Sequence, residues 1–179
     1  MTGSPDMFSL YSQAESAWRL EARRRYRVPA ETARIQAFND RRPLPPDPSV
    51  TRTLQVIRAA TQAGRSISRT HVVDLPLSSY LQYRMRVDRE NVEAGEQVSI
   101  AVRSWHPDLA RLTEDCVLFD AETSHPAVVW MRYGDDDQIV AREFSVSAAD
   151  IARAFDYYKI AAAHAVSLDE FTATLADTG

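Results

Sequence analysis

An arginine and a histidine two positions apart are the residues of this sequence best suited to anion binding or proton transfer. Arg69 and His71 lie in "SRTHVVD", a β-branched run that ends at Asp74. In an extended strand, residues two apart share one face, so both side chains would point the same way. A histidine changes charge near neutral pH, and an arginine binds anions. The alternative is a strand-end histidine that forms only local hydrogen bonds.

Other ionisable side chains could gather around this pair. Tyr80, Tyr83 and Arg84 fall on the segment after the strand, which must pack back against its neighbours. Aromatic residues at this spacing are equally typical of a core edge. Two acidic residues flank the run "CVLF" further along the chain, and they complete the candidate set. The hypothetical pocket therefore consists of Arg69, His71, Tyr80, Asp115 and Asp120, with Tyr83 and Arg84 beside it.

The only cysteine is Cys116, so no disulfide or cysteine-based zinc site can form within the chain. A cysteine nucleophile would need a histidine beside it, and His125 is the nearest in sequence. Strand alternation instead places Cys116 with Leu118 on one face, which favours a buried, unreactive thiol.

Metal and cofactor motifs are missing. The acidic run at 135–137 lacks the spacing of an EF-hand, and the four histidines show no HxxxH or HExxH pattern. With five glycines in the chain, there is no GxGxxG or GxxxxGK[ST] loop, and no GxSxG elbow. We therefore expect no metal, no cofactor and no serine-hydrolase chemistry.

A row of arginines occupies "AWRLEARRRYRV", residues 17–28. Even positions such as Trp18 and Leu20 are largely apolar, which favours a half-buried strand, although apolar residues four apart also permit a helix. In a strand, one outer face would carry Arg19, Arg23, Arg25 and Arg27, with Glu21 as the only offset. This row is a solvated or internally paired face, a contact for a protein or ligand, or a nucleic-acid contact.

Composition narrows these choices. The chain has 179 residues, 45% of them hydrophobic, and a formal net charge of −4. Bulk charge thus gives no general attraction to nucleic acid. The N-terminus lacks the basic start and apolar run of a signal peptide, and no run of eighteen apolar residues occurs. We expect a soluble cytoplasmic protein without membrane contact.

Proline residues divide the chain. "NDRRPLPPDPS", residues 39–49, separates an N-terminal segment, 1–48, from an α/β domain with C-terminal helices, 49–179. We expect the first segment to supply a strand and a helix, "VPAETARIQAF", that pack on the second.

Within 49–179, periodicity predicts alternating helices and strands. Helices are expected from Pro48 to Gly64, over 78–87, after Ser147, and from a capping box at Ser167 and Glu170. Strands are expected at 67–73 and in "EQVSIAVRS", and an antiparallel meander in "DCVLFD", "AVVWMRY" and "QIVAREFSV". The fold class is α/β, or α+β, with a single mixed sheet flanked by helices.

Several segments support a resemblance. "SAWRLEARRRYRVP", "GRSISRTHVVDLPLSSYLQYRM", "NVEAGEQV" and "DCVLFD" resemble an uncharacterised domain family of actinomycetes, often encoded beside helix-turn-helix regulators. The strand order is also similar to a phospholipase D-like half-domain with an N-terminal strand and helix extension. Aligning the Asp of HxKxxxxD on Asp120 puts Thr113 and Asp115 at the histidine and lysine positions. A chain of that kind would lack phosphodiesterase activity.

Three functions are compatible with these observations. The first is a regulatory or accessory protein that acts through a protein partner, such as a helix-turn-helix regulator, or a small ligand. The second is an enzyme of specialised metabolism that uses the pocket around Arg69, His71, Asp115 and Asp120. The third, less favoured, is nucleic-acid binding through the N-terminal arginines; a homodimer is compatible with each.

Overall fold

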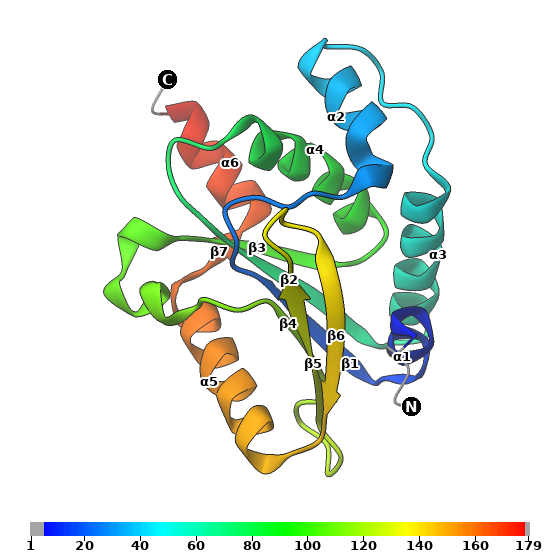
Figure 1. Ribbon diagram of the computed structural model, residues 1–179, viewed down its shortest axis with the longest axis vertical. Helices are drawn as coiled ribbons and strands as arrows, with labels where there is room; N and C mark the ends of the chain where they lie inside the picture. Colours follow the sequence, from blue (N-terminus) through cyan, green and yellow to red (C-terminus); the bar gives the residue numbers. More distant parts are fainter. Residues whose placement is uncertain (1–5, 178–179) are drawn as a thin grey trace.

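The structure, a computed structural model that describes residues 6–177, is built on one seven-stranded mixed sheet (Figure 1). The strands lie in the order β6-β5-β4-β1-β2-β3-β7. Their bounds are β1 Ser16–Glu21, β2 Ser66–Val73, β3 Gln97–Val102, β4 Cys116–Phe119, β5 Ala127–Tyr133, β6 Ile139–Ser145 and β7 Val166–Ser167.

The central strand is β1, which pairs in parallel with β2 and antiparallel with β4. Strand β2 also pairs in parallel with β3, while β4, β5 and β6 form the predicted antiparallel meander. The segment before the proline-rich break thus contributes the middle of the sheet. One sheet draws its strands from both sides of the boundary expected at residue 48.

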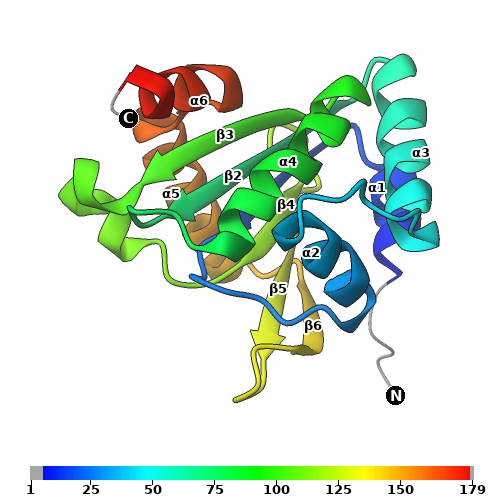
Figure 2. The same ribbon diagram turned by 90° about the horizontal axis from the view of Figure 1, so that it is seen from above.

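Six helices surround the sheet within residues 6–177. Helices α3 and α4 connect the parallel strands and lie over one face together with α1 and α2, whereas α5 covers the opposite face (Figure 2). Helix α6 contacts β3. Their bounds are α1 Met7–Gln13, α2 Thr32–Asn39, α3 Pro48–Gln62, α4 Ser79–Glu93, α5 Ala148–His164 and α6 Leu168–Asp177.

The fold class predicted from the sequence is confirmed, and local signals account for most helix ends. Ser78 and Ser147 cap α4 and α5 with their side chains, and Ser167 forms the expected capping box with Glu170. After α3, Gly64 adopts a φ of 78°, a conformation that glycine takes without strain. The prediction for α4 stopped at residue 87, six residues short of its end at Glu93.

The strand predicted for residues 17–28 is confirmed only in its first half, because β1 ends at Glu21. The next amide, that of Ala22, donates a 2.7 Å hydrogen bond to the carboxylate of Asp115 instead of to a neighbouring strand. The amide of Arg23 donates to the hydroxyl of Tyr26 at 3.1 Å. These side-chain acceptors replace the sheet ladder, so the chain turns away here.

Alternation along β1 decides which residues meet which helices. Trp18 and Leu20 join the apolar core beneath α5, with Cys116 and Leu118 of β4. Arg19 and Glu21 therefore point to the face under α1, α3 and α4. No helix in the described part of the chain combines the length and apolar character needed to cross a bilayer.

Candidate functional site

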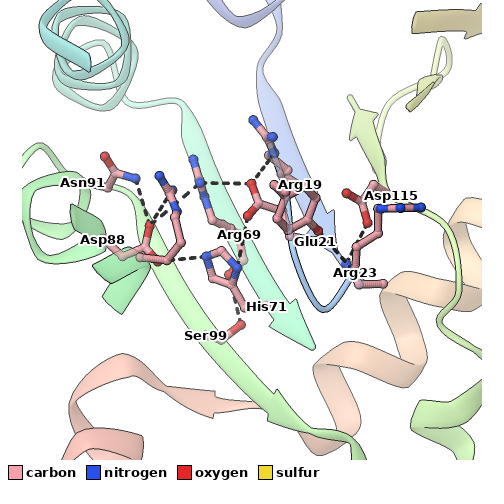
Figure 3. A network of polar contacts seen from close by, with 12 residues as sticks. Arg19, Glu21, Arg23, Arg69, His71, Asp88, Asn91, Ser99 and Asp115 are labelled. Atoms are coloured by element: carbon pink, nitrogen blue, oxygen red, sulfur yellow. Dashed lines mark hydrogen bonds and ion pairs between the residues drawn. The ribbon is translucent and has the colours of Figure 1, made fainter. Parts of the chain in front are cut away.

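His71 lies between two carboxylates under helix α4. Its Nδ1 atom is 3.1 Å from Oε2 of Glu21 on β1, and its Nε2 atom is 2.8 Å from Oδ2 of Asp88 on α4. Figure 3 shows the two acids on opposite sides of the ring. The histidine is 1% exposed and Asp88 is fully buried. Both ring nitrogens therefore face an acceptor, which favours the doubly protonated imidazolium.

Arg69, two residues earlier on β2, lies on the same face as predicted. Its Nε and Nη2 atoms donate to the two carboxylate oxygens of Glu96, at 3.0 and 3.3 Å. Its Nη1 atom donates to Oε1 of Glu21 at 3.2 Å. All three nitrogens of this buried guanidinium are thus satisfied within the protein, and the pair with Glu96 has the two-pronged geometry that suits arginine.

A second buried arginine extends the network along α4. Arg84 donates from Nη1 to Glu31 at 3.0 Å and from Nη2 to Asp88 at 3.1 Å. Asn91, which lies one helical turn after Asp88, donates to the same Asp88 oxygen at 3.3 Å. Seven charged residues that are each less than a tenth exposed contact one another here, and we call them the buried ionic network: Glu21, Glu31, Arg69, His71, Arg84, Asp88 and Glu96.

The network is electrically balanced only if His71 carries a proton. Four carboxylates belong to it, and Arg69 and Arg84 supply two positive charges. Arg19, whose Nε atom is 2.8 Å from Glu21, supplies a third. A protonated His71 completes the balance, and a buried charge without a partner would be costly.

Titration in the site follows from this arrangement. Burial alone would lower the pKa of His71, but the carboxylates of Asp88 and Glu21 outweigh it and raise the pKa to about 9. Burial likewise opposes ionisation of the two acids, yet His71 and the neighbouring arginines lower the pKa of Asp88 to about 2 and that of Glu21 well below its usual value. At neutral pH, His71 is therefore a buried cation without a free lone pair, and it is not placed to act as a general base.

Above this network lies a cavity of about 350 Å³. Its polar floor includes Glu21, Arg69 and Arg84, whereas His71 and Asp88 lie beneath the floor and do not line it. Its other walls mix apolar side chains from α1, α3, β2 and β5 with polar ones such as Thr53 and Arg142. Those walls include Tyr11, Ile57, Ile67 and Met131. Apolar walls beside fixed polar groups are typical of small-molecule sites, although this lining carries more charged residues than most.

Tyrosines form the side of the cavity near the end of β1. The rings of Tyr80 and Tyr133 lie 6.0 and 5.7 Å from the ring of Tyr26, measured between centroids. The hydroxyl of Tyr133 donates a 2.6 Å hydrogen bond to Asp115, which also accepts from Ala22. Burial raises the pKa of Asp115 despite these donors. Asp115 thus fixes the tyrosine wall and the exit of β1 without lining the cavity.

The remaining predicted residues lie elsewhere. Asp120 is at the opposite end of β4 from Asp115, where it accepts hydrogen bonds from the amides of Glu15 and Ser16 at 2.7 and 3.1 Å. The hypothetical pocket that included Asp120 is therefore not assembled, because antiparallel pairing places the two ends of β4 at opposite ends of β1. Tyr83 is fully buried against Phe38, 5.9 Å away between ring centroids.

The arginine row faces acidic groups of the β5–β6 turn. Arg23 and Arg25 pair with Asp137 at 2.6 and 2.5 Å, and Arg27 lies 3.6 Å from Asp136. The row is thus internally paired after β1, which was one of the alternatives left open. Arg19 and Arg27 also line the cavity.

Cys116 is buried on the opposite side of the sheet, in the core beneath α5. Burial raises the pKa of its thiol, so little thiolate forms near neutral pH. Among residues 6–177, the side chains grouped closely enough to hold a metal ion are those of His106, Asp108 and His164. The two imidazoles are stacked 3.7 Å apart, so their in-plane lone pairs do not converge on one point.

Sequence reasoning did not find the acids that complete the network. No motif in the sequence points to Asp88, Glu31 or Glu96, and the alternation around Glu21 predicts only an acidic residue among arginines. One signal was available: Asp88 lies four residues after Arg84 and seven after Leu81, on the helix stripe that the apolar residues define. A charged pair on an otherwise buried stripe indicates a partner across the interface.

Comparison with known proteins identifies a family but no activity. The sequence matches the family described as a domain of unknown function, DUF6879, over residues 6–173. The chain belongs to this family. The DUF6879 match thus spans both sides of the proline-rich break and every element that contributes to the cavity. No curated protein and no solved structure matches the chain, so the likeness to a phospholipase D-like half-domain stays a prediction.

Proposed function

We propose that the protein binds a small molecule in the cavity above β1 and β2, and that it acts as a regulatory or accessory factor through a protein partner. The observation that carries the proposal is the cavity of about 350 Å³ with a charged floor and apolar walls. This volume lies at the lower end of the range of small-molecule sites, about 300–1,000 Å³.

The chemistry of the site supports binding more than catalysis. His71 is held as a cation between Glu21 and Asp88, beneath the cavity floor, and has no lone pair for a substrate proton. The thiol of Cys116 is on the other face of the sheet. Among the residues that sequence reasoning selected for the pocket, Arg69 is fully engaged with Glu96 and Glu21. These groups can stabilise a binding site but are not arranged for turnover.

The protein partner is proposed on different grounds from the ligand. The resemblance to proteins encoded beside helix-turn-helix regulators favours such a regulator, in the cytoplasm. A direct nucleic-acid role has less support, because Asp136 and Asp137 already neutralise part of the arginine row.

The proposal is tested by filling the cavity. Thr53 of α3 lines it, whereas Gln55 of the same helix is exposed and does not. A library of cellular metabolites is screened by thermal shift against the wild type, Thr53→Trp and the matched control Gln55→Trp. We expect one or more compounds to raise the melting temperature of the wild type and of Gln55→Trp but not of Thr53→Trp. Compounds that stabilise Thr53→Trp equally, or a screen without any stabilising compound, would contradict the proposal.

A further inference from the structure

We infer that the cavity accepts an amphipathic organic anion, with an apolar body and one carboxylate, and that the carboxylate pairs with the Nη atoms of Arg19. This inference rests on the proposed function and names the ligand class of the same site.

Arg19 differs from the other arginines of the cavity floor in how many of its donors are used. Its Nε atom faces Glu21 at 2.8 Å, but no hydrogen bond joins its Nη atoms to any residue in 6–177. The side chain is 27% exposed although its strand is the centre of the sheet, and it lines the cavity. Figure 3 shows Glu21 between Arg19 and Arg69, so the acid engages both guanidinium groups.

An arginine with free Nη atoms in a cavity is suited to one kind of group. The two Nη atoms form a flat edge that matches the two oxygens of a carboxylate, and such a pair is stronger when water is excluded. Because Glu21 also pairs with Arg69 and His71, it does not depend on Arg19 alone and need not move when an anion approaches. The cavity therefore presents Arg19 as a fixed cation, and its acidic partner Glu21 is shared with Arg69 and His71.

The walls near Arg19 define the rest of the ligand. Four apolar or aromatic residues belong to one apolar cluster on the sheet face under α1 and α3: Tyr11, Ile57, Ile67 and Met131. An apolar body can replace water along these walls, which is the main source of binding free energy for such a group. A fully polar anion, such as inorganic phosphate, would leave them without a partner.

Charge at the cavity entrance agrees with an anion. Arg142 of β6 lines the cavity, is exposed, and has no ion pair with any described carboxylate. The charges of the buried ionic network and Arg19 balance one another, so Arg142 gives this side of the cavity an excess positive charge. Glu31 does not oppose an anion, because Arg84 pairs with it at 3.0 Å. Its second oxygen is buried without a hydrogen bond and leaves an acceptor for a hydroxyl on the ligand body.

The test compares acids with matched neutral compounds. Octanoate and 3-phenylpropanoate are titrated against the full-length protein by calorimetry, each beside its primary amide, which keeps shape and removes charge. We expect each acid to bind at least tenfold more tightly than its amide. In Arg19→Gln, the acids should lose this advantage while binding of the amides stays unchanged.

A second pair of variants keeps the inference testable if Arg19→Gln fails to fold. Arg142 is exposed, so Arg142→Gln should fold normally, and we expect a twofold to fivefold loss of affinity for the acids together with weaker salt dependence. Arg58 of α3 is exposed outside the cavity, and Arg58→Gln serves as the matched control without effect. Amides that bind as tightly as acids and compete for a site blocked by Thr53→Trp would overturn the anion inference but keep the proposed function. Failure of all four probes to bind would also overturn the inference, whereas the metabolite screen decides the proposed function separately.

Discussion

Replacement of His71 should remove a pH dependence of folding that the buried network creates. His71 is fully buried between Glu21 and Asp88, and its pKa is raised from 6.5 to about 9. A group whose pKa is higher in the folded state stabilises the fold fully below its unfolded pKa, and this contribution is lost as pH rises through the folded pKa. Stability should therefore fall between pH 6.5 and 9.

The magnitude follows from the two pKa values. A pKa of 6.5 in the unfolded chain and about 9 in the folded protein corresponds to about 3 kcal/mol, lost at no more than about 1.4 kcal/mol per pH unit. The measurement is urea unfolding at several pH values from 6 to 8.5, followed by tryptophan fluorescence. Staying at or below pH 8.5 keeps small the contribution of Cys116 and the tyrosines, whose ionisation in the unfolded chain would add to the effect.

Two variants separate His71 from other causes. His71→Gln should be less stable at pH 6, because the neutral Gln removes one positive charge and leaves the buried network with a net negative charge. Its free energy of unfolding should vary little up to pH 8.5. His125→Gln, at an exposed position, should keep the wild-type slope. A wild-type stability that is flat from pH 6.5 to 8.5, or a His71→Gln protein with an unchanged slope, would refute a cationic His71.

Three further predictions concern residues outside the buried ionic network. Asp120→Ala should lower the free energy of unfolding by about 1–3 kcal/mol in urea, because two amides lose their acceptor, whereas Asp120→Asn should cost less, since Asn tolerates the φ of 53° there. Cys116 should resist a disulfide exchange reagent in the native protein and react on unfolding; rapid native labelling would contradict its burial. Because Asp136 and Asp137 pair with the arginine row, the wild type should bind a DNA duplex weakly in fluorescence anisotropy. The double variant Asp136→Asn, Asp137→Asn should bind more tightly and with a steeper salt dependence, and an unchanged affinity would count against pairing as the cause.

Local sequence signals predicted most of the elements because their causes are local. The proline at the start of α3, the serine caps of α4 and α5, and the alternation of Val98, Ile100 and Val102 in β3 each act within a few residues. The order of the strands depends on pairing between segments that are far apart in the sequence. Nothing local in residues 16–21 indicates that this segment pairs with strands that begin fifty and a hundred residues later, so its central place in the sheet was not foreseen.

Part of the site was predictable for the same reason. Strand periodicity correctly placed Arg69 and His71 on one face, and the helix after them brings Tyr80 and Arg84 over the same region. A motif alignment places Asp120 at the site, but the structure does not bring it to Arg69 and His71. Its carboxylate is instead an acceptor for the amides that begin β1, a role that depends on the pairing of β4 with β1.

The least predictable feature is that two charged positions of β1 lie under helices instead of facing solvent. Arg19 and Glu21 alternate with Trp18 and Leu20, a pattern that normally marks a solvent-facing row. Here α4 brings Asp88 and Arg84 over these positions, and β2 contributes Arg69 and His71, so Glu21 is buried and the side chain of Arg19 is only 27% exposed. Apolar residues of similar volume would hold such an interface together at least as well, since buried ion pairs give little net stability. Stability alone therefore does not explain the network, and the cavity directly above it, which shares Glu21 and Arg69 with it, is where a functional reason is to be sought.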